Sequence, residues 1–239
     1  MNIAIIFAGG TGQRMRNTAR PKQFLELYGK PIIIYTLEIF QSHPDIDAII
    51  VPCVEGWHDR LRDMAQKFGI TKLMKVVSGG QTSQDSKLSA LHALKDICND
   101  HDIILMHDAV RPLITQQVIS DNIDSVKSFG SAITVDHFTE TGIISDDGKT
   151  VETTVERQRL YIAKAPQSFY YSDILAAHES AVGMPSSTAI DTCTIMTTLG
   201  KKLHFVPCDR CNIKITTPED YYIFKAIHDL RESQDVLGI

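Results

Sequence analysis

Apolar runs of strand length alternate with longer segments of helical period along most of this 239-residue chain, and this alternation limits the folds open to it. Three helical segments carry boundary signals, with Pro31 in a first turn, Thr115 as an N-cap and Gly69 as a stop. Strands that alternate with helices form a mostly parallel sheet with helices on both faces. We therefore predict an α/β fold of the Rossmann-like kind. The predicted strands are residues 2–7, 47–53, 73–79, 102–109, 131–136 and 203–207, and the predicted helices are residues 30–41, 56–69, 83–100, 115–130 and one from Pro218.

The alternation is interrupted between His137 and Ala163. Asp147 and Gly148 stand there between two β-rich runs, which is typical of a hairpin. No internal repeat or low-complexity linker divides the chain. We interpret residues 137–163 as a projecting antiparallel arm inserted into a single domain, residues 1–239.

The composition argues against several classes of protein. A formal net charge of -5 does not suit a general nucleic-acid binder, so we expect no nucleic-acid partner. No apolar run approaches membrane-spanning length and no basic-then-apolar leader precedes the first strand, so we expect a cytoplasmic protein without membrane contact. The five cysteines would then be free thiols. Cys208 and Cys211 have C-x-x-C spacing, but no second pair or histidine cluster follows them. We therefore interpret them as small residues near a strand end and not as a zinc site.

The first predicted strand ends in the glycine-rich stretch "AGGTGQRM", residues 8–15. It lacks the lysine of a Walker A loop, and Met15 occupies the third glycine position of a dinucleotide-binding loop. The physics of phosphate binding remains, because glycines let main-chain N–H groups approach oxygen atoms closely. Arg14 adds a permanent charge suited to phosphate. The alternative is a tight strand-to-helix turn with solvated charges.

Three further segments would bring charged groups to the same edge of the sheet. Lys22 follows in "RPKQF", and Asp108 ends an apolar strand where its carboxylate could hold Mg²⁺ on a triphosphate. Lys214 lies in what we predict to be a short strand before the last helix. A turn-capping role for Asp108 and a surface position for Arg111 are the alternatives. Four separate segments with such groups favour a phosphate-binding site over coincidence.

Together these segments resemble the family of cytidylyltransferases that make CDP-linked polyols from methylerythritol phosphate or ribitol 5-phosphate. The resemblance implies transfer of CMP from CTP to a small polyol phosphate, with release of pyrophosphate and Mg²⁺ as cofactor. It runs from the first strand to the last helix. The matching stretches are "AGGTGQRM", "PKQFLELYGKPIIIYTLE", "GGQTSQDS", "HDAVRP", "VERQRLYIAKAPQSF" and "NIKITTPED".

The resemblance also implies roles for individual residues. Arg14, Lys22 and Lys214 would be catalytic, and Asp108 would bind the metal. In the family the arm crosses between the subunits of a homodimer and delivers an arginine to the partner's site, and Arg157 stands at that position. The residues expected to bind the nucleotide are Ala8, Gly9, Gly10, Thr11, Gly12, Gly79, Gly80 and Ser86, and those expected to bind the acceptor are Arg111, Thr139 and Arg157.

This sequence departs from the family pattern at two places. Ser83 stands where an arginine is usual, and Ala165 stands where a threonine is usual. The stretches "AGGTG" and "DAVRP" lean towards the ribitol-type enzymes, so we expect D-ribitol 5-phosphate as acceptor, with 2-C-methyl-D-erythritol 4-phosphate as the alternative. An inactive nucleotide-binding regulatory module and a dehydrogenase are the remaining alternatives. The retained charged residues argue against the first, and Met15 argues against the second.

Overall fold

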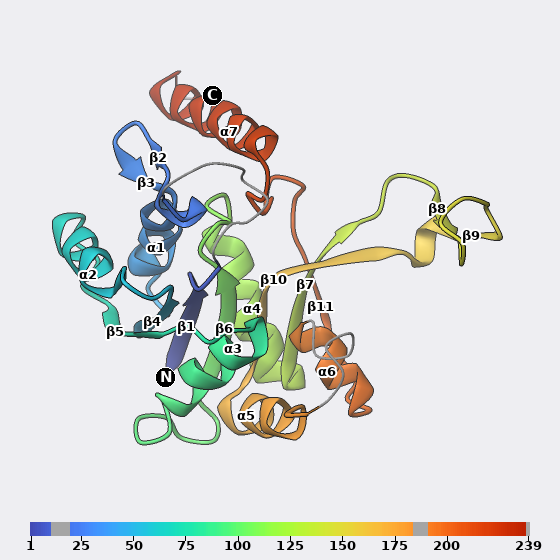
Figure 1. Cartoon of the computed structure of the whole chain (residues 1–239), viewed down its shortest axis with the longest axis horizontal. Coiled ribbons are helices and arrows are strands. Elements are labelled where there is room, and N and C mark those ends of the chain that lie inside the picture. Colours follow the sequence, from blue (N-terminus) through green and yellow to red (C-terminus); the bar gives the residue numbers. More distant parts are fainter. Residues whose placement is uncertain (11–19, 184–190, 238–239) are drawn as a thin grey trace.

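The centre of the molecule is a seven-stranded sheet, formed within residues 1–10, 20–183 and 191–237, which the computed structural model describes (Figure 1). Its order is β11-β7-β10-β6-β1-β4-β5. β1 pairs in parallel with β4 and β6, whereas β10 runs antiparallel to β6 and β7. The prediction of a mostly parallel sheet is confirmed. The strands are β1 (Asn2–Phe7), β4 (Ala48–Cys53), β5 (Leu73–Ser78), β6 (Ile103–Asp108), β7 (Ser131–His137), β10 (Tyr161–Tyr170) and β11 (Phe205–Pro207).

Helices cover both faces of the sheet, and the alternation of side chains along β1 shows how. Ala4 and Ile6 pack in one core cluster with residues of α1, α2 and α4, whereas Ile3 and Ile5 pack in another with residues of α3, α5 and α6. Successive side chains of a strand point to opposite faces, so one buried strand supplies both cores. The helices are α1 (Ile32–Ser42), α2 (His58–Lys67), α3 (Ser83–His92), α4 (Gln116–Phe129), α5 (Tyr171–Ser180), α6 (Thr192–Thr198) and α7 (Pro218–Leu237).

Several predicted helix boundaries are confirmed and one is wrong. The Thr115 hydroxyl accepts from the backbone N–H of Val118 at the start of α4, and Gly69 has a positive φ just after α2. The predicted helix over residues 83–100 stops at His92. Beyond it the backbone bonds change to the i→i−3 pattern, as in Ile97 N–H to Leu94 C=O (2.9 Å), and such tight turns do not extend far.

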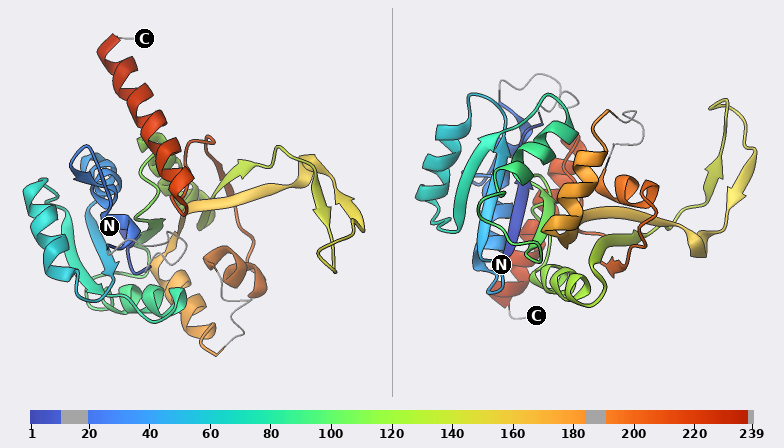
Figure 2. Two further views of the ribbon diagram at one scale, coloured as in Figure 1. Left: turned by 45° about the horizontal axis from the view of Figure 1, so that its top comes forward. Right: turned by 90° about the horizontal axis from the view of Figure 1, so that it is seen from below.

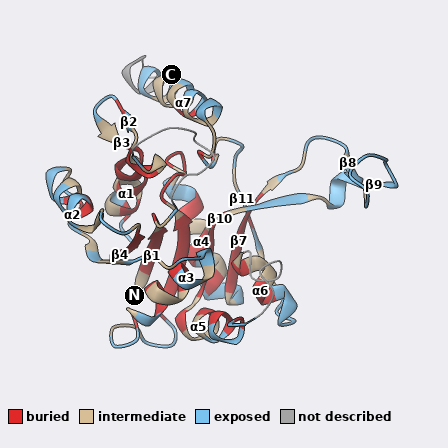
Figure 3. Ribbon diagram, in the orientation of Figure 1, coloured by how far each residue is buried: buried red, intermediate tan, exposed pale blue. Residues whose placement is uncertain are grey.

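An arm projects from the body of the molecule in all views (Figures 1 and 2) and is mostly exposed (Figure 3). It contains β8 (Gly142–Ile144), β9 (Thr153–Val155) and the short 3₁₀ helix η2 (Arg157–Arg159), and β8 pairs antiparallel with β9. Asp147 shapes the turn, because its Oδ1 accepts from the N–H groups of Lys149 and Thr150, both at 2.7 Å. The predicted hairpin is thus present. That this arm crosses to the site of a second subunit remains a prediction.

The last helix, α7, closes a third and smaller core. Phe224 of α7 is buried there together with Leu27 and Ile32, which precede and begin α1, and with Val110 and Ile215. The short η1 (Lys22–Phe24), β2 (Glu26–Leu27) and β3 (Lys30–Pro31) precede α1 in the same region. Among the helices of the described residues, none combines the length and the apolar character needed to cross a membrane.

Candidate active site

A cavity of about 870 Å³ opens at the carboxyl ends of β1, β4, β5 and β6, where open α/β sheets bind their ligands. Glycines after β1 and β5 form part of its lining, and we call Gly9, Gly10, Gly79 and Gly80 the glycine wall. Residues 163–165 and 167 of β10 form another part, the β10 wall. Because β6 lies between β1 and β10 in the sheet, its last residue, Asp108, stands between the two walls.

The glycine wall allows little room for side chains at three of its four positions. A Cβ on Gly9 would lie 3.2 Å from Ser86 Oγ, one on Gly79 would lie 3.2 Å from the Cα of Gly9, and one on Gly80 would lie 2.0 Å from a Cβ of α3. The N–H of Gly80 also donates to Ser86 Oγ at 3.0 Å. At Gly10, by contrast, a Cβ would meet no described atom within 4 Å. Packing therefore demands glycine at Gly80 and makes a side chain tight at Gly9 and Gly79, whereas the described residues leave space beside the backbone of Gly10.

Gln23 holds the backbone after β1 in place. Its Nε2 donates to the carbonyl oxygens of Ala8 at 2.6 Å and Gly10 at 3.1 Å, and the side chain is buried. Lys22, the residue before it in η1, lines the cavity. The segment "RPKQF" therefore shapes the glycine wall and brings a positive charge beside it.

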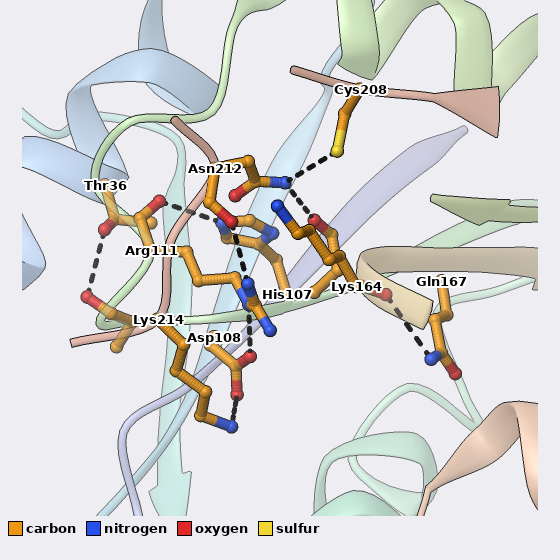
Figure 4. A network of polar contacts seen from close by, with 11 residues as sticks. Thr36, His107, Asp108, Arg111, Lys164, Gln167, Cys208, Asn212 and Lys214 are labelled. Carbon is orange, nitrogen blue, oxygen red and sulfur yellow. Dashed lines mark hydrogen bonds and ion pairs between the residues drawn. The ribbon is translucent and has the colours of Figure 1, made fainter. Parts of the chain in front are cut away.

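A cluster of one carboxylate and two cations, Asp108, Arg111 and Lys214, lies between the walls; we call it the central cluster (Figure 4). Asp108 Oδ1 lies 2.7 Å from Lys214 Nζ, and Oδ2 lies 2.8 Å from Arg111 Nε. Burial alone would raise the pKa of Asp108, but the charges of Lys214 and Arg111 outweigh it and hold the pKa well below its usual range. The carboxylate is therefore ionised at neutral pH, and the cluster keeps an excess of one positive charge.

Lys214 reaches the cluster from an irregular segment, so the predicted strand at this position is wrong. Individual hydrogen bonds hold the segment, in place of the regular hydrogen bonds of a paired strand. Ile215 N–H donates to Val110 C=O at 2.9 Å, and Asn212 Nδ2 donates to Ala165 C=O at 2.7 Å. The backbone carbonyl of Asn212 also accepts from Arg111 Nη1 at 2.9 Å. The segment is therefore tied both to the turn that follows β6 and to β10.

The sequence that builds this site matches a known family. The family model described as IspD, 2-C-methyl-D-erythritol 4-phosphate cytidylyltransferase, matches residues 2–229. The chain belongs to this family. It is therefore a CTP-dependent nucleotidyltransferase, as the resemblance implied.

The curated relatives are similar over their whole length. A ribitol-5-phosphate cytidylyltransferase from Streptococcus agalactiae serotype V is 46% identical over 239 residues, and one from Vibrio parahaemolyticus is 48% identical over 238 residues, with each pair of chains covered completely. Among solved structures, a 4-diphosphocytidyl-2C-methyl-D-erythritol synthase from Anaerococcus prevotii superposes with a TM-score of 0.80 at 26% identity, covering 95% of each chain.

Most of the residues predicted for the site of this IspD-family chain line the cavity. They are Ala8, Gly9, Gly10, Lys22, Gly79, Gly80, Ser86, Asp108, Arg111 and Lys214. Thr11, Gly12 and Arg14 lie outside the described residues. Thr139 and Arg157 are exposed residues of the arm and do not line the cavity of their own chain.

The structure adds Lys87 to the cavity lining, a residue that sequence reasoning did not single out. Lys87 lies on α3, four residues after Ser83, and is only 7% exposed. Ser83 is the position at which the family pattern has an arginine. Burial lowers the pKa of Lys87, while the carboxylates of Asp191 and Asp108 act in the opposite direction. The signal was in the sequence, since Lys87 is in helical register with the buried Leu91 and Leu94.

Asp191 and Thr192 also line the cavity, and a buried imidazole supports Thr192. His178 Nδ1 lies 2.9 Å from Gln84 Oε1, and Nε2 lies 3.1 Å from Thr192 Oγ1. Since Gln84 Nε2 donates to the His178 carbonyl at 3.0 Å, its Oε1 must accept, and Nδ1 therefore carries the proton. Burial, followed by the charge of Lys87, lowers the pKa of His178 to about 3.

Proposed function

We propose that this enzyme transfers CMP from CTP to D-ribitol 5-phosphate, giving CDP-ribitol and pyrophosphate. Full-length identities of 46% and 48% to relatives named ribitol-5-phosphate cytidylyltransferase carry the proposal. Three solved structures of methylerythritol enzymes are 24% to 26% identical to this chain. 2-C-methyl-D-erythritol 4-phosphate is the second candidate acceptor, supported by the description of the family model. A reaction that uses CTP suits a cytoplasmic enzyme.

The glycine wall suits the triphosphate of CTP. Bare main-chain N–H groups can approach phosphate oxygens there, and Gly10 leaves room for that approach. Lys22 stands beside this wall, and Lys87 adds a cation on α3. We propose that Lys87 supplies positive charge that the family usually provides from the position of Ser83.

The reaction is a substitution at the α-phosphorus of CTP. A phosphate oxygen of the acceptor forms the new bond to this phosphorus, the bond to the β-phosphate bridging oxygen breaks, and its electron pair leaves with pyrophosphate. The acceptor phosphate is already anionic, so no general base is needed. The main obstacle is repulsion between the anions, and we propose that Arg14, Lys22 and Lys214 relieve it and stabilise the charge on the five-coordinate phosphorus.

We propose Mg²⁺ as cofactor, with Asp108 as its protein ligand. Both oxygens of Asp108 already meet cations, yet each retains a lone pair, and Lys214 is 42% exposed and can shift. No three His, Cys, Asp or Glu side chains gather into a metal site in the described part of the chain. A single carboxylate suits Mg²⁺, which commonly takes its other ligands from substrate phosphates and water. Bound there, the metal would neutralise phosphate charge.

We propose a homodimer in which the arm of one subunit reaches the cavity of the other. Arg157 and Thr139 would then meet the acceptor bound to the partner chain, which accounts for their distance from the cavity of their own chain. Apolar side chains are exposed on the arm, namely Ile143, Ile144 and Val151. Such side chains favour an interface with another protein surface.

Pyrophosphate release tests the proposed function directly. The purified enzyme with CTP and Mg²⁺ should release pyrophosphate on addition of ribitol 5-phosphate, and much more slowly with 2-C-methyl-D-erythritol 4-phosphate. The reverse preference would assign the second acceptor. CTP with Mg²⁺ should also raise the melting temperature. Stabilisation by CTP without turnover of either acceptor would indicate a binding module.

A further inference from the structure

A second ion pair involves a residue that lines the cavity and is separate from the three residues of the central cluster. Lys164 Nζ, from the β10 wall, lies 2.9 Å from Asp136 Oδ2 on β7. The two side chains are only 10% and 14% exposed. Ion pairs on the surface lose little solvation on folding, but a pair as enclosed as this one is costly to desolvate. A contribution to stability is therefore a weak reason for its presence.

The backbone of β10 is irregular at this lysine. The pairing of β10 with β7 shifts register between Ala163 and Gln167, and Lys164 lies within the shift. Such irregularities re-aim side chains and occur often beside active sites. The Lys164 side chain runs from β10 towards Asn212 in Figure 4. Its charge opposes the effect of burial on the pKa of the Cys208 thiol, whose Sγ accepts from Asn212 Nδ2 at 3.9 Å. The ammonium therefore lies beside the segment that delivers Lys214 to the central cluster.

The charge of this pair distinguishes it from the rest of the site. Asp136 balances Lys164, whereas the central cluster keeps an unbalanced cation and the glycine wall has Lys22 beside it. A balanced pair attracts an anion weakly but still offers hydrogen bonds, because an ammonium has three donors and Asp136 occupies one. Neutral hydroxyl groups match that chemistry better than phosphate does.

The position of the Lys164–Asp136 pair indicates which substrate would supply these hydroxyl groups. β6 separates the β10 wall from the glycine wall, so a nucleotide whose phosphates lie along the glycines leaves the β10 side to the acceptor. We propose that Lys164 donates hydrogen bonds to the hydroxyl oxygens of the acceptor's polyol chain and thereby selects it. Asp136 is a positioning residue that fixes and neutralises the ammonium. This inference rests on the proposed function, and it identifies the part of the site that reads the polyol.

The test compares acceptors that share a phosphate but differ in hydroxyls. Lys164→Met should raise KM for ribitol 5-phosphate by about tenfold or more, because it removes a hydrogen bond from a charged donor. KM for CTP should stay within about twofold, as should the inhibition constant of glycerol 3-phosphate, whose short chain carries fewer hydroxyls. Lys201→Met is the matched control. It removes the lysine of another Lys–Asp pair, exposed on α5 and the segment after α6, and should change none of these constants.

The outcomes separate the inference from the proposed function. An unchanged KM for ribitol 5-phosphate in a folded Lys164→Met enzyme overturns the inference alone, and so does an equal loss for all three ligands. No turnover of ribitol 5-phosphate by the unaltered enzyme refutes the proposed function and the polyol subsite with it. If Lys164→Met does not fold, Asp136→Asn, which keeps its shape, provides the test. It should raise KM for ribitol 5-phosphate while leaving KM for CTP unchanged, and equal changes in both overturn the inference.

Discussion

Acid should destabilise this enzyme through His178. The imidazole is fully buried and neutral between Gln84 and Thr192, and its pKa is lowered to about 3 from an ordinary value of 6.5, mainly by burial. Unfolding returns the ring to water, where it binds a proton below about pH 6.5. The unfolded state therefore binds more protons than the folded state between these two values, and stability falls as the pH falls through that range.

The size of the effect follows from the shift. Each pH unit over which the unfolded state carries one extra proton changes the free energy of unfolding by about 1.4 kcal/mol. From about pH 6.5 to about pH 5, His178 alone should therefore remove about 2 kcal/mol. The buried His107, whose pKa burial lowers to about 4, adds a separate loss in the same direction. A loss of this size is a large fraction of the stability of an ordinary domain.

Urea unfolding of the enzyme and of His178→Gln, at about pH 7.5 and about pH 5, measures the contribution of His178. The variant should lose about 2 kcal/mol less on acidification, because only His107 and other groups still titrate. Ile174→Val, one turn earlier on α5 and also buried, is the matched control and should be destabilised equally at both pH values. An acid loss in His178→Gln equal to that of the parent would refute the reasoning. So would an NMR titration of the parent in which the His178 ring protonates above about pH 5.

Three further predictions concern activity. Lys22→Ala or Lys214→Ala should each lower kcat by ~10²–10³ with little change in melting temperature, and full turnover would remove that lysine from the catalytic set. Gly10→Ala should keep its stability but bind CTP more weakly by calorimetry, because its Cβ would meet no atom of the described residues within 4 Å and would stand where phosphate oxygens approach. Gly80→Ala should instead be destabilised, because its Cβ would approach a neighbouring atom to 2.0 Å. Unchanged CTP affinity in Gly10→Ala would contradict the proposed phosphate position. Arg157→Ala should raise KM for the acceptor more than KM for CTP, and equal increases would contradict its role.

The parallel core could be predicted from the sequence because its signals are local. Strand-length apolar runs, a threonine N-cap and a glycine stop each act within a few residues. The inner half of β10 was not predicted as a strand. Lys164, Pro166 and Gln167 interrupt its apolar pattern, and its place between β6 and β7 depends on pairing with residues far away in the sequence. The strand predicted at Lys214 was wrong for a related reason, because isolated apolar neighbours do not supply a partner strand.

The candidate site was predictable where one rule, that ligands lie at the carboxyl ends of parallel strands, identified the residues. This rule identified Asp108, and the glycine-rich stretch after the first strand was found by its composition. The rule could not find Lys164, because the ion pair with Asp136 arises from the register of two strands 28 residues apart. Gln23 gave no signal either, since its bonds to Ala8 and Gly10 depend on how the chain returns after β1.

The register shift in β10 divides that strand into two lengths with different support. Tyr161, at the arm end, and the next two residues pair with β7 alone, whereas residues 167–169 are held on both sides, by β6 and β7. A pull on the arm that is transmitted along β10 is therefore resisted by three residue pairs before it reaches Lys164. Amide hydrogens of the outer length should exchange with solvent faster than those of the inner length. A force that a neighbouring molecule applies to the arm through β10 should therefore displace Lys164 before it displaces the glycine wall.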